Sequence, residues 1–233
     1  MILLVNGDSH TAGAEAVNSY AFAEDDPRYV YQGRKPHPDN IKVSWGYKLA
    51  GPLKAKYHCL AESASSNDRI IRTTRTWLEN NPANEDRLLI IQWSTWERQE
   101  WLIDNVYFQV NASGIDDVPE SHQDKYKKFV ANVDWQEATK KAHNKIWQFH
   151  LALQEQNIKH VFFNGNSHFS DISDRKEWGT SYIGPYDYKA TYDYWLTEQG
   201  YQKVNPKSYH YGPDAHKAWQ SKILHYVIDN ELV

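Results

Sequence analysis

Four short apolar runs, each bounded by polar residues, are spread along the chain. They cover Ile2–Val5, about Tyr57–Ala61, about Leu88–Trp93 and about His160–Phe163. Short runs rich in aliphatic, β-branched and aromatic residues are typical of strands that are buried on both faces of a sheet. The pattern therefore predicts strands at these positions, the first of them almost at the amino terminus.

Between these runs, apolar residues recur every three or four positions, which is the period of an amphipathic helix. The longest such segment is Trp135–Leu153. Another starts at the candidate caps Ser66 and Asn67 and runs to Leu78, since Ser and Asn side chains accept hydrogen bonds from the first turn of a helix. A third opens with proline and covers Pro213–Val227, as proline is favoured in a first turn.

Strands that alternate with helices indicate a parallel sheet covered on both faces. We therefore predict an α/β fold, a three-layer α/β/α sandwich around a central parallel sheet. No linker divides the 233 residues, so a single domain over residues 1–233 is expected. Residues 23–41 and 104–134 lack a clear period and are interpreted as long loop insertions that form walls of an active-site cleft.

The composition narrows the class of protein. The formal net charge is −4 and no basic tract is present, so we expect no nucleic-acid partner. The lone Cys59 excludes an intramolecular disulfide, and no Cys/His cluster has the spacing of zinc ligands. We expect neither a metal nor a cofactor. No leader and no run of about 20 apolar residues is present, which predicts a soluble, cytoplasmic protein without a membrane partner.

The candidate chemistry begins directly after the first strand, in the run NGDSHTAG from Asn6 to Gly13. A strand that ends in Gly-Asp-Ser and then turns exposes a serine hydroxyl at the carboxyl edge of the sheet, where ligands of open α/β sheets bind. Gly-Asp-Ser is also an ordinary turn sequence. If Ser9 is a nucleophile, the chain must also supply a base and oxyanion donors.

The longer pattern resembles the first signature block of the SGNH (GDSL) hydrolases, roughly Gly-Asp-Ser-x-Thr-x-Gly. Every fixed position is met, by Gly7, Asp8, Ser9, Thr11 and Gly13. The resemblance implies the three-layer, flavodoxin-like fold of that superfamily and a serine esterase activity with Ser9 as the nucleophile.

In this family the base is a histidine shortly before the last helix, in a pattern like His-Pro-x-x-x-Gly-His. The stretch HYGPDAH keeps the two histidines at that separation. The resemblance therefore implies that His210 is the base and His216 a structural residue. The reverse assignment, with His216 as the base, remains open from the residues alone.

The family's orienting acid lies three residues before the base, but Lys207 occupies that position here. A lysine cannot accept the Nδ1 proton. Either another carboxylate takes its place, with Asp187 and Asp193 as the nearby candidates, or a backbone carbonyl does, or the enzyme uses a Ser-His dyad. Loss of the orienting acid lowers the rate of such enzymes severely.

The oxyanion hole is implied by two further blocks. The run Leu60–Ile70 resembles the second block, with Ala64 in place of its usual glycine and with matches at Ser66, Asn67, Arg69 and Ile70. The N–H groups of Ser9 and Ala64 are then the backbone donors. The third block should supply an Asn, but this strand ends Gln-Trp-Ser-Thr-Trp, so the hydroxyl of Ser94 or Thr95 is the candidate replacement. A missing donor typically costs about 10²–10³ in rate.

Three neighbouring residues have simpler interpretations. Asp8 is expected to bond the backbone of its turn. His10 points away from Ser9 if the chain stays extended, so it is not expected to be the base. Arg98 is either a solvated charge near the start of a helix or an anchor for an anionic or sugar group of a substrate.

The chain has ten Trp and sixteen Tyr, many of them between Trp178 and Trp219. They are either packing residues or flat platforms for sugar rings. The tract Trp178–Leu196 also resembles GDSL-type proteins of tailed bacteriophages, which would imply a location in the virion or the host-cell cytoplasm.

The leading hypothesis is a serine esterase that acts on a small-molecule or glycan ester, such as an O-acetyl group on a carbohydrate. The alternative is a catalytically weak or inactive binding protein of the same fold that recognises a glycan through its aromatic tract.

Overall fold

The computed structural model describes residues 1–17, 36–81, 86–112 and 118–233. The strands are β1 (Ile2–Asn6), β2 (Lys56–Cys59), β3 (Arg87–Trp93), β4 (Gln99–Ile103), β5 (Val106–Val110) and β6 (Lys159–Asn164). The α-helices are α1 (Ser9–Ala12), α2 (Pro38–Val43), α3 (Trp45–Ala50), α4 (Asn67–Asn80), α5 (Gln123–Ala131), α6 (Trp135–Glu155), α7 (Tyr192–Glu198) and α8 (Pro213–Asp229). Short 3₁₀ turns are η2 (Glu120–His122), η3 (Gly179–Ser181) and η4 (Tyr188–Ala190).

The four apolar runs of the sequence form one sheet with the strand order β2-β1-β3-β6. All three pairings are parallel, and Leu3 lies between Tyr57 on one neighbour and Leu88 on the other. The predicted central parallel sheet is therefore confirmed. Because the strands are parallel, their carboxyl ends meet at one edge, where the loops that follow β1, β2 and β3 come together.

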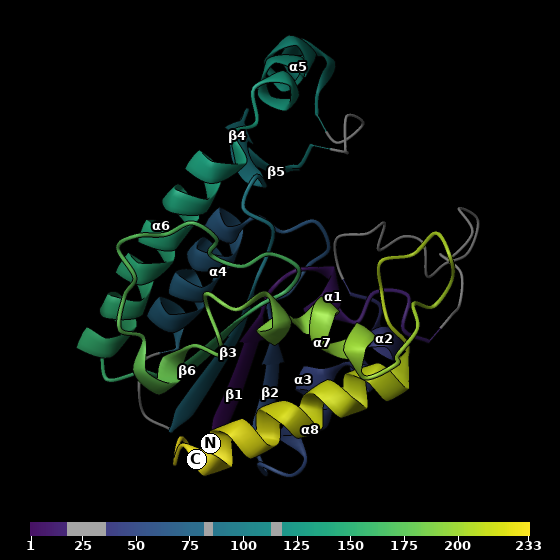
Figure 1. The fold of residues 1–233 in the computed structure, drawn as a ribbon, viewed down its shortest axis with the longest axis vertical. Coiled ribbons are helices and arrows are strands. Elements are labelled where there is room, and N and C mark those ends of the chain that lie inside the picture. Colours follow the sequence, from purple (N-terminus) through teal and green to yellow (C-terminus); the bar gives the residue numbers. More distant parts are fainter. Residues whose placement is uncertain (18–35, 82–85, 113–117) are drawn as a thin grey trace.

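Helices cover both faces of this sheet, as Figure 1 shows. On one face, alternate strand residues such as Leu3 and Val5 pack against α3, α7 and α8 in a cluster that includes Trp45 and Trp219. On the other face, Leu4 and its equivalents pack against α4 and α6. The predicted three-layer α/β/α arrangement is confirmed, and its two apolar layers follow directly from the two-residue period of the strands.

The three predicted helices are present close to their predicted bounds. Ser66 is the N-cap of α4, and its hydroxyl accepts a hydrogen bond from the Arg69 N–H at 3.2 Å. Pro213 begins α8. The long periodic segment forms α6, which Asp134 caps by accepting from the Glu137 N–H.

The prediction that residues 104–134 form a loop is wrong. Strands β4 and β5 pair as an antiparallel hairpin, and α5 packs on it through a small apolar cluster that includes Trp101, Val110 and Tyr126. Figure 1 shows this unit beyond one end of the sheet. The other predicted loop, residues 23–41, lies outside the described residues up to residue 35, and α2 begins within its last residues at Pro38.

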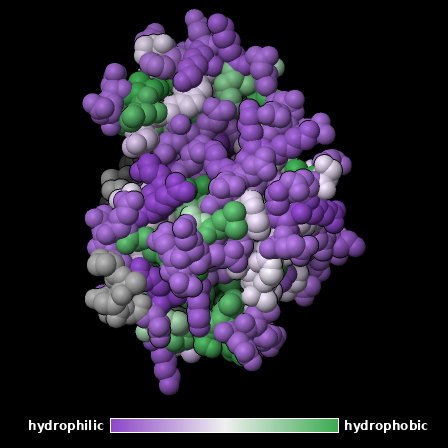
Figure 2. Space-filling model, turned by 90° about the vertical axis from the view of Figure 1, so that its left-hand side faces the viewer, coloured by the Kyte–Doolittle hydropathy of each residue, from purple (hydrophilic) through white to green (hydrophobic). Residues whose placement is uncertain are grey.

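The surface is mainly hydrophilic on the side of the molecule turned toward the viewer in Figure 2, with small hydrophobic areas between polar ones. In the described ranges, no helix is both long and apolar enough to cross a membrane.

Candidate active site

Ser9 is the first residue of α1, immediately after the turn that ends β1. Asp8 caps this short helix and accepts a hydrogen bond from the His10 N–H at 3.0 Å. A side chain on Gly7 would lie 2.6 Å from the Thr11 hydroxyl. Gly13 ends α1 in the left-handed conformation at φ 69°, which favours glycine. The spacing of the Gly-Asp-Ser-x-Thr-x-Gly pattern therefore corresponds to one tight strand–turn–helix unit.

The Asp8 carboxylate is the centre of a buried hydrogen-bond network, because only 3% of the residue is exposed. Besides the backbone of its own turn, it accepts from Gln92 Nε2 at 2.8 Å, from the Ser94 hydroxyl at 2.9 Å and from Arg98 Nη1 at 3.2 Å. Burial works to raise the pKa of Asp8, but the neighbouring His10, the Arg98 guanidinium and the Gln92 amide lower it overall. The network ties the Ser9 turn to the end of β3.

Arg98 is thus an ion-pair partner of Asp8 and not a solvated charge, while its role as a substrate anchor stays a prediction. Its Nη1 donates to Asp8 and also to the Ser94 hydroxyl, at 2.8 Å. Its side chain is 21% exposed. The ion pair with Asp8 was not expected, because nothing in the local sequence connects residues that are ninety positions apart.

Ala64 has φ 59°, the left-handed conformation that its family position normally fills with glycine. The N–H groups of Ser9 and Ala64 have no hydrogen-bond acceptor within the described part of the chain. The two loops are joined indirectly: Asn67 Oδ1 accepts from the Ser94 N–H at 2.9 Å, and the Ser94 hydroxyl donates to Asp8. Both N–H groups lie on the segments that follow β1 and β2, at the carboxyl edge of the sheet.

The hydroxyls of Ser94 and Thr95, the candidates for a third donor, have other partners in the structure. The Ser94 proton goes to Asp8, and the Thr95 hydroxyl donates to Glu97 Oε1 at 3.1 Å. A hydroxyl has a single proton to donate. Neither side chain has a proton left for an oxyanion in this arrangement.

His210 has a carboxylate partner, Glu15, whose Oε2 lies 2.8 Å from the imidazole Nδ1. The Ser208 hydroxyl donates to the same Glu15 oxygen and accepts from the His210 N–H at 2.9 Å. The hydrogen bond from His210, supported by Ser208 and opposed by partial burial, lowers the pKa of Glu15. An ionised carboxylate can only accept, so Nδ1 carries the proton and Nε2 is left as the basic nitrogen.

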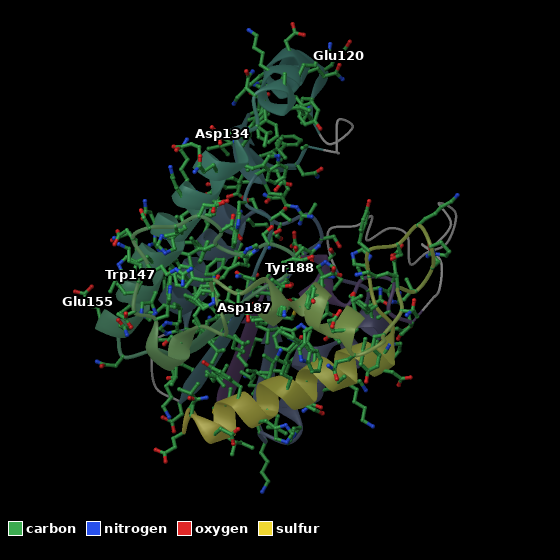
Figure 3. The ribbon with its side chains drawn as sticks, in the orientation of Figure 1. Glu120, Asp134, Trp147, Glu155, Asp187 and Tyr188 are labelled. Carbon is green, nitrogen blue, oxygen red and sulfur yellow. The ribbon has the colours of Figure 1, made fainter. Side chains whose placement is uncertain are left out.

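Glu15 is the site residue that sequence reasoning missed. Neither Asp187 nor Asp193 takes the orienting position, because each has other partners. Asp187 caps η4 through the Lys189 N–H at 2.9 Å, and Figure 3 labels it beside Tyr188, apart from the loop before α8 that carries His210. Asp193 forms an ion pair with Lys203 and accepts from the Tyr211 hydroxyl. The signal that could have found Glu15 is an acidic side chain two residues after Gly13, at the end of the serine turn.

The rings of His10 and His210 lie next to each other, with centroids 5.3 Å apart. The chain turns into α1 after Asp8 instead of staying extended, so the condition under which His10 was expected to point away from Ser9 is not met. His10 is 5% exposed, and burial lowers its pKa to about 4, opposed by Asp8. It is therefore a neutral neighbour of His210. Because Ser9 precedes His10, the contact also brings the Ser9 turn and the His210 loop together.

His216 has the position of a structural residue. It is 1% exposed on the first turn of α8, and its Nδ1 accepts from the Trp45 N–H at 3.3 Å. Burial is the main cause that lowers its pKa to about 3. This imidazole links α8 to the start of α3.

The aromatic tract is partly core. Trp178, Tyr182 and Tyr192 are at most 4% exposed and pack in the two clusters beside the sheet. Tyr188 is 47% exposed. The packing interpretation therefore holds for the three buried rings, which offer no open face to a sugar.

Within the described ranges, no group of three His, Cys, Asp or Glu side chains comes together as a metal site would require.

Comparison with known proteins gives a match between residues 31–155 and the model of a family of unknown function, DUF6071. No curated protein matches. A similar solved structure is a member of the lipolytic protein G-D-S-L family from Veillonella parvula, with 11% identity, coverage of 98% of this chain and 97% of that one, and a TM-score of 0.45.

Proposed function

We propose that this chain, which belongs to the DUF6071 family of unknown function, is a serine hydrolase. It cleaves a carboxylic ester through an acyl-enzyme on Ser9. The observation that carries this proposal is the Glu15–His210 pair, at 2.8 Å, beside the turn of Ser9. The carboxylate sets the imidazole tautomer that a general base needs.

In the first step, His210 Nε2 accepts the Ser9 hydroxyl proton as Oγ attacks the ester carbonyl carbon. The C=O bond becomes a C–O⁻ bond, and the N–H groups of Ser9 and Ala64 donate to that oxygen. When the tetrahedral intermediate collapses, His210 returns the proton to the leaving alcohol. Glu15 stays ionised throughout and stabilises the imidazolium.

In the second step, a water molecule attacks the acyl-enzyme carbonyl while His210 accepts one of its protons. The C–O bond to Ser9 breaks, the carboxylic acid leaves and the proton returns to Oγ. Two backbone donors without a third side-chain donor imply a modest turnover, because one donor typically contributes about 10²–10³ in rate.

The substrate is proposed as an ester with a small acyl group, and an O-acetyl group on a carbohydrate is the first natural type to assay. This finer choice rests on the resemblance to SGNH hydrolases, since the buried rings of the aromatic tract do not support it.

The test compares hydrolysis of p-nitrophenyl acetate and of an O-acetylated sugar by the wild type and by Ser9→Ala. We expect hydrolysis by the wild type, lost in Ser9→Ala with an unchanged Tm. Hydrolysis retained by Ser9→Ala, or none by the wild type, would overturn the proposal. A glycan array on Ser9→Ala then tests the binding-protein alternative.

A further inference from the structure

The β4–β5 hairpin contacts the loop that carries Ala64 through one buried side chain, Gln109, which is 3% exposed. Its Oε1 accepts two hydrogen bonds from Ser66, from the N–H at 2.9 Å and from the hydroxyl at 2.9 Å. Its Nε2 donates to Glu100 Oε2 at 2.8 Å. Within the described residues, three hydrogen bonds of this amide are present, and two of them fix Ser66, two positions after Ala64.

Glu100 holds the amide of Gln109 in that orientation. It lies directly opposite Gln109 in the hairpin register, and its side chain is 5% exposed. Arg72 of α4 donates to both of its oxygens, at 2.8 and 2.6 Å. The hairpin is thus joined to α4 by a chain of charge-assisted hydrogen bonds that ends at Ser66.

The Ala64 loop is held on its other side by Arg69. This guanidinium donates to the Leu60 carbonyl at 3.0 Å and to the Ser65 hydroxyl at 3.2 Å, and it pairs with Glu62 at 2.7 Å. These contacts fix the start of the loop, whereas Gln109 fixes its end. Between them, Ala64 has to keep a left-handed backbone that alanine rarely adopts.

We propose that Gln109 is a positioning residue for the oxyanion hole. Through it, the β4–β5 hairpin holds the Ala64 loop so that the Ala64 N–H points at the developing oxyanion. The inference rests on the proposed function. It explains why a hairpin outside the main sheet places a fully buried glutamine against the N-cap of α4.

The first variant is Gln109→Met, which keeps the length of the side chain and removes its three hydrogen bonds. We expect kcat on p-nitrophenyl acetate to fall about 10- to 100-fold with KM nearly unchanged, because a displaced donor loses much of its effect on the transition state. The matched control is Gln99→Met, the same change on the same hairpin at an exposed position. It removes an acceptor of the Trp101 Nε1–H at 2.8 Å, but no bond to Ser66, and should leave kcat unaltered.

The second variant tests the geometry by rescue. Gln109→Glu alone places two carboxylates opposite each other and should lower kcat, since like charges across a strand pair repel. Adding Glu100→Gln restores one carboxylate and one amide, with the two groups exchanged. The carboxylate at position 109 then accepts from Ser66, and the amide at position 100 turns its oxygen toward Arg72. We expect kcat of the double variant to return to within about threefold of the wild type.

An activity-independent measurement keeps the two proposals apart. Hydrogen exchange of the Ser66 amide should be slow in the wild type and in Gln99→Met, and at least about tenfold faster in Gln109→Met. If the wild type hydrolyses esters but Gln109→Met keeps its kcat, the positioning role is overturned and the esterase remains. If the wild type is inert, the esterase proposal fails, and the positioning role fails with it.

Discussion

The two halves of the candidate site are built in different ways. The nucleophile half consists of the Ser9 turn and the Asp8 network, in which Asp8 after β1 and Gln92 and Ser94 at the end of β3 are almost completely buried. The base half consists of His210 and Glu15, whose side chains are 20% and 21% exposed and lie on segments outside the sheet. One half is fixed by the core, and the other by contacts between two irregular segments.

The difference indicates how each half will respond to substitution. A residue of the Asp8 network is bonded to several buried partners, so its loss should affect folding more than catalysis. A residue in the base half has one or two partners close to solvent, so its loss should affect catalysis and leave the fold intact. The following predictions test this comparison in decreasing order of the expected effect.

The largest effect on catalysis is expected from His210, with His216 as the comparison. His210→Gln removes the base and should lower kcat by at least about 10³-fold with an unchanged Tm. His216→Asn should retain most of the activity but lower Tm, because the buried Trp45 N–H loses its present acceptor. Steady-state kinetics and thermal unfolding of both variants measure this. The opposite pattern would make His216 the base.

An intermediate effect is expected from Glu15→Gln. The amide no longer stabilises the imidazolium or sets its tautomer, so kcat should fall about 10- to 10³-fold while KM and Tm change little. Asp187→Asn, at a carboxylate that caps η4 instead, is the control and should be as active as the wild type. Equal activity of Glu15→Gln and the wild type would indicate a Ser-His dyad.

The smallest effect on catalysis and the largest on stability are expected from Asp8→Asn. Without the charge, Arg98 loses its ion-pair partner, and the free energy of unfolding at pH 7 should fall by about 3 kcal/mol. Since the pKa of Asp8 is lowered in the fold, its contribution is complete above the unfolded value of about 3.9 and is lost as the pH falls through the folded value.

Urea unfolding at pH 7 and at about pH 3 measures this contribution. The gap in stability between wild type and Asp8→Asn should narrow at the lower pH. A gap that widens on acidification would contradict the account of the Asp8 network.

The sequence predicts the parts of the molecule that depend on local pattern. The four strands, the helices that became α4, α6 and α8, and the Ser9 turn all follow from periodicity, caps and a contiguous motif. The short α3 and the α5 helix were not predicted, because α3 has a single buried stripe over six residues and α5 packs on the hairpin outside the main sheet. In such segments tertiary contacts decide the structure.

The base half shows the same limit within the candidate site. Glu15 and His210 are 195 positions apart, whereas the candidates Asp187 and Asp193 were chosen because they are close to His210 in sequence. Ser94 was a reasonable oxyanion donor by position. Its proton is used by Asp8, a contact that only the fold brings about.

The measurement that tests the central claim most directly is labelling with a fluorophosphonate probe, followed by mass-spectrometric identification of the modified residue. The account predicts a single adduct on Ser9, absent in Ser9→Ala and His210→Gln and retained in His216→Asn. An unlabelled wild type, or an adduct on another residue, would contradict it.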